Sequence, residues 1–216
     1  MNFEDASENL HCHIFEGNLG HLWTQLGHHD QISQFHSLWV GHLVAETLQK
    51  VSLYSDKHPL IILGALMHDV GKIKVPAHLL TKKERLTEEE LWIVRNGHVE
   101  AGWELLSEHP SLQYAAGGHH AVQRVPFTAK SFSWKALPPW VKFGVLLTSI
   151  CDMVDRMNRR IRKCDPPKSV AQMRAELQSE HFPMLQDMQE LIELVLEVVV
   201  EQQASPLATA EIDDIE

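Results

Sequence analysis

The sequence predicts an all-α fold in which short loops join the helices. Apolar residues recur every three to four positions through several long segments, as in helices with one buried face. Glycine and proline fall between these segments, and no segment alternates polar and apolar residues as a half-buried strand does. The 216 residues, of which 44% are hydrophobic, are enough for one domain with a substantial core.

The first two predicted helices differ in how much of their surface is apolar. Residues 33–51 are apolar along one side, which predicts a helix with a single buried face. Residues 60–69, LIILGALMHD, are apolar on nearly every side, so this helix should be buried all round. Gly71 and Pro76 are expected to end it, and residues 72–86 are expected to form a loop.

A capping box predicts where the next helix begins. Thr87 suits the N-cap, and Glu90 follows it three residues later. The helix should run on through residues 91–106. Pro110 suits the first turn of a further helix that reaches toward His119.

The second half of the chain contains a long loop and two more predicted helices. Residues 121–138 lack helical periodicity and contain two prolines, which predicts the loop. Residues 140–162 should be helical until the sequence DPPK at 165–168. Residues 184–203 form a last helix whose wide apolar face suits core packing or a homodimer contact.

We expect three parts along the chain. Residues 1–28 should form an arm that packs on the bundle, and residues 29–204 should form the helical domain. Residues 205–216 are acidic and are expected to be disordered.

Charge and composition exclude several classes of partner. A net charge of -10 argues against binding a nucleic-acid duplex, but a small phosphorylated substrate needs only a few local cations or metals. The three cysteines form no C-x-x-C pair, which suits a reducing compartment. The acidic N-terminus does not resemble a signal peptide, and no apolar run approaches the ~20 residues of a membrane span. We therefore expect a cytoplasmic protein without a membrane contact.

Several histidines and aspartates fall on helix faces that should point inward. His36 shares the apolar side of residues 33–51, whereas His42 lies about 120° away from it. His98 lies in the apolar stripe of its helix, and Asp152 and Asp155 continue the apolar stripe of residues 140–162. Polar groups on buried faces are costly unless they are paired or bound to metal.

Each of these residues has a simpler explanation when it is taken alone. A single inward histidine is more often a hydrogen-bonded core residue, and adjacent histidines such as His119 and His120 occur by chance among 15 histidines. Asp155 and Arg159 fit an ordinary helix salt bridge. The complete set, spread over separate helices, is hard to explain by chance. Imidazoles and carboxylates without cysteine suit Fe, Mn or Zn in a catalytic site, and Asp69 can bridge two ions.

The motifs resemble the HD superfamily of metal-dependent phosphohydrolases, in particular its HD-GYP branch. The similar segments are HDQISQFHSLWV, ALMHDVGKIKVP, LTEEELWIVRNGHVEAGWELL, the His pair at 119–120 and SICDMVD at 149–155. The resemblance covers residues 29–160 and implies an HD-type helical bundle.

The resemblance also implies a set of site residues. The implied metal ligands are His36, His68, Asp69, His98, His119, His120 and Asp152. In this scheme His36, His68 and Asp152 hold one ion, the other three histidines hold a second, and Asp69 bridges them. Asp69 and Lys72 are the candidate catalytic residues, with Lys72 beside the substrate phosphate. Asp155, Arg159 and Arg124 are further candidates for substrate contact.

The chain departs from the branch after the His pair. Ala121 stands where an acidic residue is typical, and no Gly-Tyr-Pro stretch follows. Ile32 replaces the Glu that holds a third metal in some members, so we expect two divalent transition metals. Fe or Mn is favoured over Zn, Ni or Mg.

The function expected from these residues is metal-dependent phosphoester hydrolysis. The substrate should be a phosphodiester or nucleotide-like molecule, with cyclic dinucleotides among the candidates. One alternative is a catalytically silent HD module that signals or binds. A second alternative is an HD-type diiron oxygenase, because some HD proteins with similar ligands activate oxygen.

Overall fold

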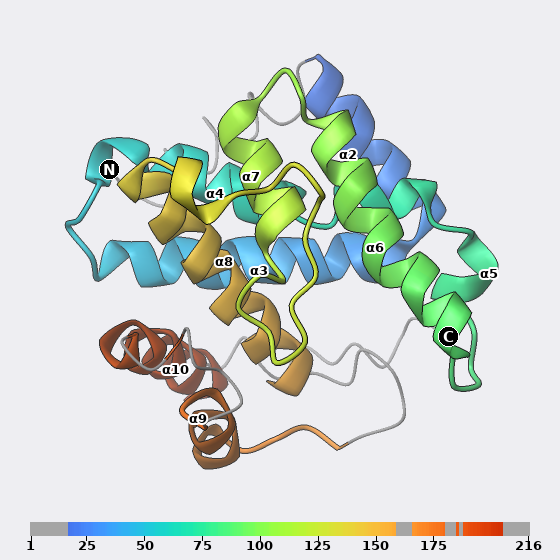
Figure 1. Cartoon of the computed structure of the whole chain (residues 1–216). Helices are drawn as coiled ribbons and strands as arrows, with labels where there is room; N and C mark the ends of the chain where they lie inside the picture. Colours follow the sequence, from blue (N-terminus) through green and yellow to red (C-terminus); the bar gives the residue numbers. More distant parts are fainter. Residues whose placement is uncertain (1–16, 159–165, 180–184, 186–187, 205–216) are drawn as a thin grey trace.

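The structure is a computed structural model, and it describes residues 17–158, 166–179, 185 and 188–204. Every regular element in this part of the chain is a helix, as the sequence predicts (Figure 1). In chain order they are α2 (Asn18–His29), α3 (Gln31–Gln49), η1 (Ser55–Lys57), α4 (His58–Met67), η2 (Val70–Lys74), α5 (Ala77–Leu80), α6 (Glu88–Leu105), α7 (Pro110–Gly118), η3 (Trp134–Ala136), α8 (Pro139–Asn158), α9 (Val170–Leu177) and α10 (Gln189–Ala204).

Helix α3 is the central element, and α8 crosses it in Figure 1. It packs against α2, α4, α8 and α10. Its buried face carries Val40, Leu43, Val44 and Leu48, which join the largest hydrophobic cluster together with residues of α4, α8, α9 and α10. Burial of this apolar surface is the main term that stabilises the bundle.

The buried helix α4 ends two residues earlier than the sequence predicts. Its apolar residues from Ile61 to Met67 are largely buried, but Leu60 is 41% exposed. His68 and Asp69 therefore leave the last turn of α4 and lie in the connection to η2. The prediction that residues 72–86 form only a loop is wrong, because this segment contains most of η2 and the short helix α5.

Helix α6 begins at the predicted capping box. The Thr87 side chain accepts a hydrogen bond from the Glu90 backbone N–H, and the Glu90 carboxylate accepts one from the Thr87 N–H. The middle of α6 packs against η2, where Gly71 touches its backbone. A Cβ at Gly71 would overlap the carbonyl oxygen of His98, so only glycine fits this contact.

Two further helices lie outside the sequence-based prediction. Helix α2 lies within the segment expected to be an arm, and its Leu22 and Trp23 join a hydrophobic cluster with residues of α4 and α7. His29, at the end of α2, hydrogen-bonds the distant carbonyl of Val75. Helix α9 has a capping box formed by Ser169 and Gln172, a signal that the proline-rich segment before it obscured.

Helix α10 buries its apolar face within the chain. It begins at Gln189, later than the predicted residue 184, and residues 184, 186 and 187 lie outside the described part. Its Ile192, Val195 and Leu196 are inaccessible to solvent in the core. Lys50 links α3 to this helix through Glu201 at 2.8 Å. Core packing thus accounts for the apolar pattern, and the homodimer contact stays a prediction.

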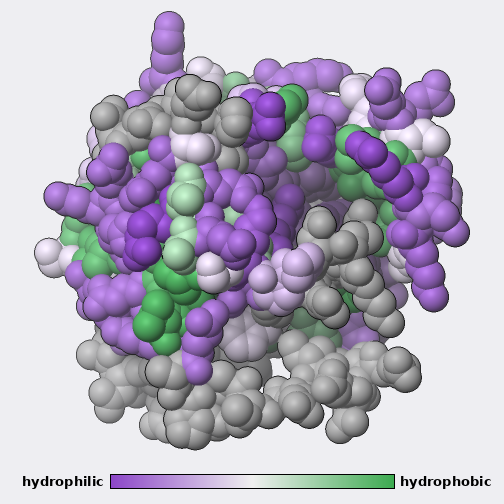
Figure 2. Space-filling model, turned by 90° about the horizontal axis from the view of Figure 1, so that it is seen from below, coloured by the Kyte–Doolittle hydropathy of each residue, from purple (hydrophilic) through white to green (hydrophobic). Residues whose placement is uncertain are grey.

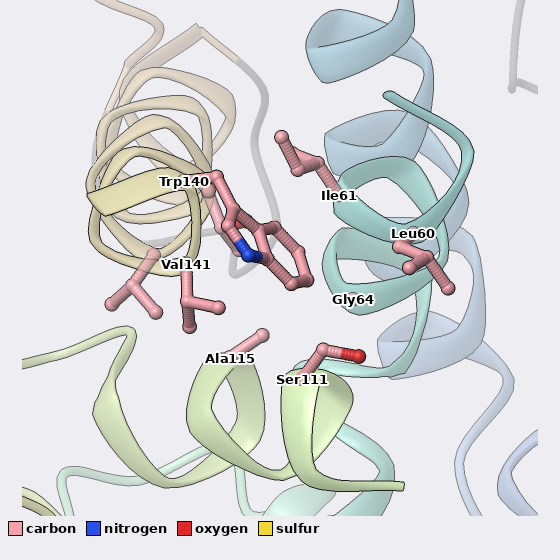
Figure 3. Close-up of a pocket in the computed structure, with 10 residues that line it drawn as sticks. Leu60, Ile61, Gly64, Ser111, Ala115, Trp140 and Val141 are labelled. Carbon is pink, nitrogen blue, oxygen red and sulfur yellow. The ribbon is translucent and has the colours of Figure 1, made fainter. Parts of the chain in front are cut away.

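A small cavity lies where α4, α7 and α8 meet. Figure 3 shows the Trp140 indole between the backbones of α8 and α4, with Gly64 and Ala115 close by. The cavity volume is about 10 Å³, which is room for one water at most. It is too small for a phosphorylated substrate.

The face of the molecule that Figure 2 shows is largely hydrophilic where its residues are described. In the view of Figure 2, hydrophobic residues form separate smaller patches among hydrophilic ones. Among the described residues, no helix is both long and apolar enough to cross a bilayer.

Candidate metal centre

The histidines and aspartates predicted as metal ligands lie together inside the bundle. None of their side chains is more than 3% exposed. They are His36 from the middle of α3, His68 and Asp69 directly after α4, His98 from α6, His119 and His120 directly after α7, and Asp152 from α8. Segments far apart in the sequence thus build one buried polar cluster.

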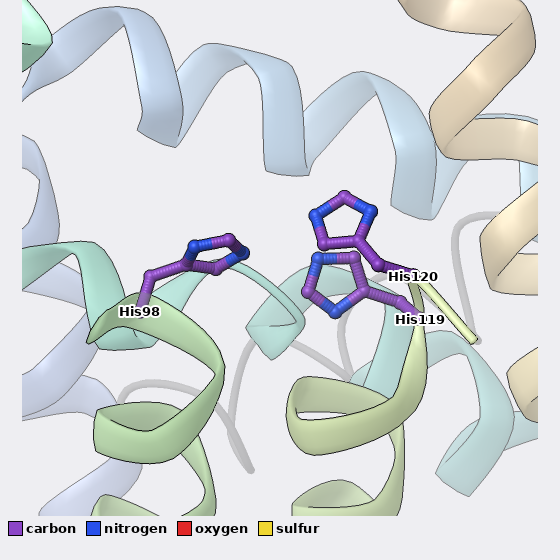
Figure 4. A group of neighbouring side chains, drawn as sticks. All are labelled: His98, His119 and His120. Carbon is purple, nitrogen blue, oxygen red and sulfur yellow. The ribbon is translucent and has the colours of Figure 1, made fainter. Parts of the chain in front are cut away.

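Three of these histidines form one group, which Figure 4 shows. His98 projects from α6, and His119 and His120 project from the end of α7 into the same space. The rings of the last two lie 3.8 Å apart, and His98 lies 5.4 and 5.2 Å from them, between centroids. One ligand nitrogen of each lies within 4.8 Å of the others, a spacing at which the three side chains could hold one metal ion.

Asp69 lies between this group and a second one made by His36 and His68. Its Oδ1 is 3.7 Å from Nε2 of both His98 and His119. Its Oδ2 is 3.7 Å from Nε2 of His36 and 3.6 Å from Nε2 of His68. Two donors that each lie about 2.1 Å from an ion are at most about 4.2 Å apart. Each carboxylate oxygen can therefore share an ion with its own pair of histidines.

The donor atoms of this cluster fit a metal because they are buried without hydrogen-bond partners. They are Nε2 of His68, His98, His119 and His120, Oδ2 of Asp152 and both carboxylate oxygens of Asp69, of which Oδ2 has an ion pair with Lys72. Leaving so many polar atoms unpaired in the interior would cost several kcal/mol. Metal ions bound between them would remove that cost.

The other ring nitrogen of most of these histidines is held by an acceptor. Nδ1 of His68 lies 2.6 Å from the carbonyl oxygen of Ala65, and Nδ1 of His98 lies 2.6 Å from that of Val94. Nδ1 of His119 lies 3.0 Å from the carbonyl oxygen of Ala116. A proton on Nδ1 leaves the Nε2 lone pair free, which is the tautomer that binds metal.

His120 has a side-chain neighbour in place of a carbonyl. Its Nδ1 lies 2.5 Å from Nε2 of the Gln123 amide, whose nitrogen and oxygen are interchangeable by a flip. With the amide oxygen turned toward Nδ1, Gln123 accepts the proton and His120 presents the same tautomer as the others. Sequence reasoning missed Gln123, because a loop residue three positions after a histidine has no periodic signal.

His36 lies between two carboxylates of α8. Its Nε2 is 2.9 Å from Oδ1 of Asp152, and its Nδ1 is 2.7 Å from Oδ2 of Asp155. Asp155 is 2% exposed. The structure therefore places Asp155 behind a candidate ligand, a different neighbourhood from the substrate contact expected from sequence.

Burial and charge shift the pKa values in the cluster. Burial lowers the pKa of His98 to about 4 and holds those of His119 and His120 well below the usual range. Burial also lowers the pKa of His36, but hydrogen bonds to Asp152 and Asp155 outweigh it, so the net pKa is raised. Burial opposes ionisation of Asp69, but Lys72 and the histidines hold its pKa well below the usual range. Apart from His36, whose raised pKa favours the protonated ring, the cluster thus offers neutral imidazoles and ionised carboxylates, the states that bind metal.

Two cations reach the buried carboxylates. Nζ of Lys72 lies 2.5 Å from Oδ2 of Asp69, and Lys72 is 15% exposed. Nε of Arg156 lies 2.9 Å from Oδ1 of Asp152, and Arg156 is 40% exposed. Sequence reasoning singled out Lys72 and missed Arg156, although its spacing of four residues from Asp152 is a signal for contact on a helix.

The loop after the His pair brings an aromatic side chain to the cluster. The Phe127 ring lies 4.2 Å from the His120 ring, and the Arg95 guanidinium lies 5.6 Å from the Phe127 centroid. Arg124 is exposed and forms no ion pair among the described residues. Arg159, the remaining residue predicted to contact substrate, lies outside the described residues.

Comparisons with known proteins identify the family of the chain. The catalogued HD domain family matches residues 35–196. A relative is the cyclic di-GMP phosphodiesterase response regulator RpfG of Xanthomonas campestris pv. campestris (strain 8004), 32% identical over 68 residues. That match covers 32% of this chain and 18% of the relative, so the chain spans a small part of that protein.

Solved structures show the same fold. The HD domain of the L. monocytogenes phosphodiesterase PgpH in complex with cyclic-di-AMP superposes with a TM-score of 0.60 at 17% identity. The match covers 84% of this chain and 95% of that one. A second structure of that domain gives a TM-score of 0.60 at 16% identity, covering 84% of this chain and 96% of that one. Together with the family match over most of the chain, these findings show that the chain belongs to the HD domain family.

Proposed function

We propose that this protein is a metal-dependent phosphohydrolase with two metal ions. The observation that carries the proposal is the position of Asp69, whose two oxygens face separate histidine pairs while Lys72 lies against one of them. A carboxylate between two ion sites, with a lysine beside it, suits a water nucleophile and a phosphoryl group.

The proposed ligand sets follow the two groups of side chains. His98, His119 and His120 would hold one ion, and His36, His68 and Asp152 would hold the other, with Asp69 shared between them. Nitrogen and carboxylate ligands without cysteine suit Fe or Mn. When bound, the ions would lower the pKa of a water ligand and stabilise charge on the phosphoryl oxygens.

The surrounding residues have positioning and electrostatic roles in this proposal. Asp155 keeps the proton of His36 on Nδ1, so that Nε2 faces the ion. Lys72 places a positive charge where negative charge grows on the phosphoryl group. Burial of the ligands excludes bulk water and so strengthens these interactions.

The substrate class follows from the relatives and from the loop after the His pair. RpfG is named a cyclic di-GMP phosphodiesterase, and the PgpH domain was solved with cyclic-di-AMP. This chain has Phe127 packed on His120 in a segment without Gly-Tyr-Pro. We therefore propose a small or nucleotide-like phosphoester as the substrate, acted on in the cytoplasm, and slow or absent hydrolysis of cyclic di-GMP.

A metal analysis followed by a substrate screen tests the proposal. Protein purified without oxygen should contain close to two transition metals per chain. It should then hydrolyse p-nitrophenyl phosphate, bis(p-nitrophenyl) phosphate or a nucleotide, and a chelator should abolish the activity. If fully loaded protein hydrolyses none of these substrates, the silent HD module replaces the hydrolase. Oxygen uptake with a mixed-valent iron signal would support the diiron oxygenase.

A further inference from the structure

The cations Lys72 and Arg156 approach the cluster through different carboxylates. Lys72 contacts Oδ2 of Asp69, and Arg156 contacts Oδ1 of Asp152. Both oxygens lie within 4 Å of Nε2 of His36 and of His68. The two cations therefore belong to the same end of the site, the end that contains the His36 and His68 group.

Arg156 contacts the Asp152 oxygen that faces His36 and His68. Its Nε shares Oδ1 of Asp152 with Nε2 of His36, each at 2.9 Å. Oδ2 of the same carboxylate is buried and has no hydrogen-bond partner. An ion held with His36 and His68 would lie nearest Oδ1, and this oxygen has a second lone pair besides the one that Arg156 occupies. Arg156 is thus anchored on a candidate ligand through Nε.

The Arg156 side chain is partly exposed to solvent, which leaves its terminal nitrogens available for a ligand. The side chain is 40% exposed, whereas Asp152 is fully buried, so the guanidinium spans from the surface to the cluster. Among the described acidic residues, only Asp152 forms an ion pair with it. A guanidinium held at Nε still has donors on its terminal nitrogens, which match two oxygens of one phosphoryl group.

We infer that Arg156 binds the substrate phosphoryl group and favours one with two negative charges. The inference rests on the proposed phosphohydrolase function and names its substrate class more closely. A phosphomonoester or terminal phosphate carries a charge of about −1.5 to −2 near neutral pH, and a phosphodiester carries a single negative charge. Lys72 and Arg156 each add one positive charge beside the ions, and this favours the doubly charged group.

Binding of dead-end ligands tests this inference without turnover. Inorganic phosphate represents the doubly charged group, and dimethyl phosphate represents the diester. Both would be titrated by calorimetry into protein loaded with Mn. The wild type should bind phosphate at least about tenfold more tightly than dimethyl phosphate, which corresponds to one charge-assisted hydrogen bond.

Arg156→Gln should weaken phosphate binding by about tenfold or more and dimethyl phosphate binding much less, at unchanged metal content. The phosphate affinity of Arg156→Lys should lie between those of the wild type and Arg156→Gln, because lysine keeps the charge but lacks the planar guanidinium. Arg85→Gln is the matched control, since Arg85 is exposed and pairs with no described acidic residue. Equal weakening of both ligands, unchanged phosphate binding or loss of metal in Arg156→Gln would each overturn the inference. If the wild type binds phosphate selectively and hydrolyses nothing, the hydrolase proposal fails and the Arg156 inference stands.

Discussion

Oδ2 of Asp69 lies 2.5 Å from Nζ of Lys72, three residues later in the chain. The carboxylate is fully buried and the lysine is 15% exposed, so Lys72 connects the interior of the cluster to its edge. This pair joins the two parts of the proposed chemistry, because Asp69 is a proposed ligand of both ions and Lys72 is the proposed phosphoryl contact.

The first prediction concerns the shared ligand. Asp69→Ala should lose both metals, because the carboxylate oxygens face both histidine groups. Elemental analysis of the purified variant measures this. His42→Ala should keep both, since His42 lies on α3 outside the cluster and contacts Trp39. Full metal content in Asp69→Ala would show that Asp69 does not bridge.

The second prediction separates catalysis from metal binding. Lys72→Ala should keep the metals and lower the turnover of a phosphoester by about 100-fold, as loss of a transition-state donor does. Metal content and steady-state rates would be measured on the same sample. An unchanged rate would limit Lys72 to neutralising Asp69.

The third prediction concerns the pH dependence of stability in the metal-free protein. The pKa of His98 is lowered from 6.5 to about 4 by burial. Between these pH values the unfolded chain binds the proton and the folded chain does not, so acid favours unfolding. The lowered pKa of His98 alone should decrease the free energy of unfolding by about 3 kcal/mol as the pH falls from 6.5 to 4.

Urea unfolding of metal-free protein at several pH values measures that loss. The lowered pKa values of His68, His119 and His120 act in the same direction, whereas the raised pKa of His36 opposes them. His98→Asn should show a weaker pH dependence than the wild type. If the free energy of unfolding changes equally with pH in the two proteins, burial does not lower the pKa of His98.

The fourth prediction concerns the contact between η2 and α6. Gly71→Ala should destabilise the protein by at least about 2 kcal/mol and disturb metal binding, because the new Cβ overlaps the His98 carbonyl. Gly97→Ala, on α6, is the control, since its Cβ would meet only Val75 at 3.9 Å. The Gly97→Ala protein should be as stable as the wild type or more stable by up to about 1 kcal/mol, because alanine has the higher helix propensity. Thermal unfolding with metal analysis tests both, and an unaffected Gly71→Ala protein would contradict the close contact.

The fifth prediction concerns the loop after the His pair. The kcat/KM for bis(p-nitrophenyl) phosphate should exceed that for cyclic di-GMP, because Phe127 covers the face of His120. Phe127→Ala should narrow this difference, and Val125→Ala should not, since Val125 is 63% exposed. Efficient, saturable hydrolysis of cyclic di-GMP by the wild type would show that the Gly-Tyr-Pro stretch is dispensable.

Periodicity and capping signals in the sequence determined the all-α class and most of the helices. The hydrophobic spacing of α3 and the Thr87 capping box depend on residues close together in the chain, so they can be read directly. Helix α9 was not predicted because it is short and its apolar pattern is weak. The prolines before it indicated only a loop. Motif order and inward-facing positions also singled out the histidines and aspartates that the structure brings together.

Only the tertiary structure decided which atoms meet. Asp69 faces two histidine pairs because the connection after α4 passes between α3, α6 and the end of α7. Asp152 and Asp155 lie on His36 because α8 crosses α3 at that turn. Such contacts join residues more than 100 positions apart, as with His36 and Asp155, and no local pattern encodes them. Packing of helices against one another sets these distances, and they determine which charges remain for a substrate.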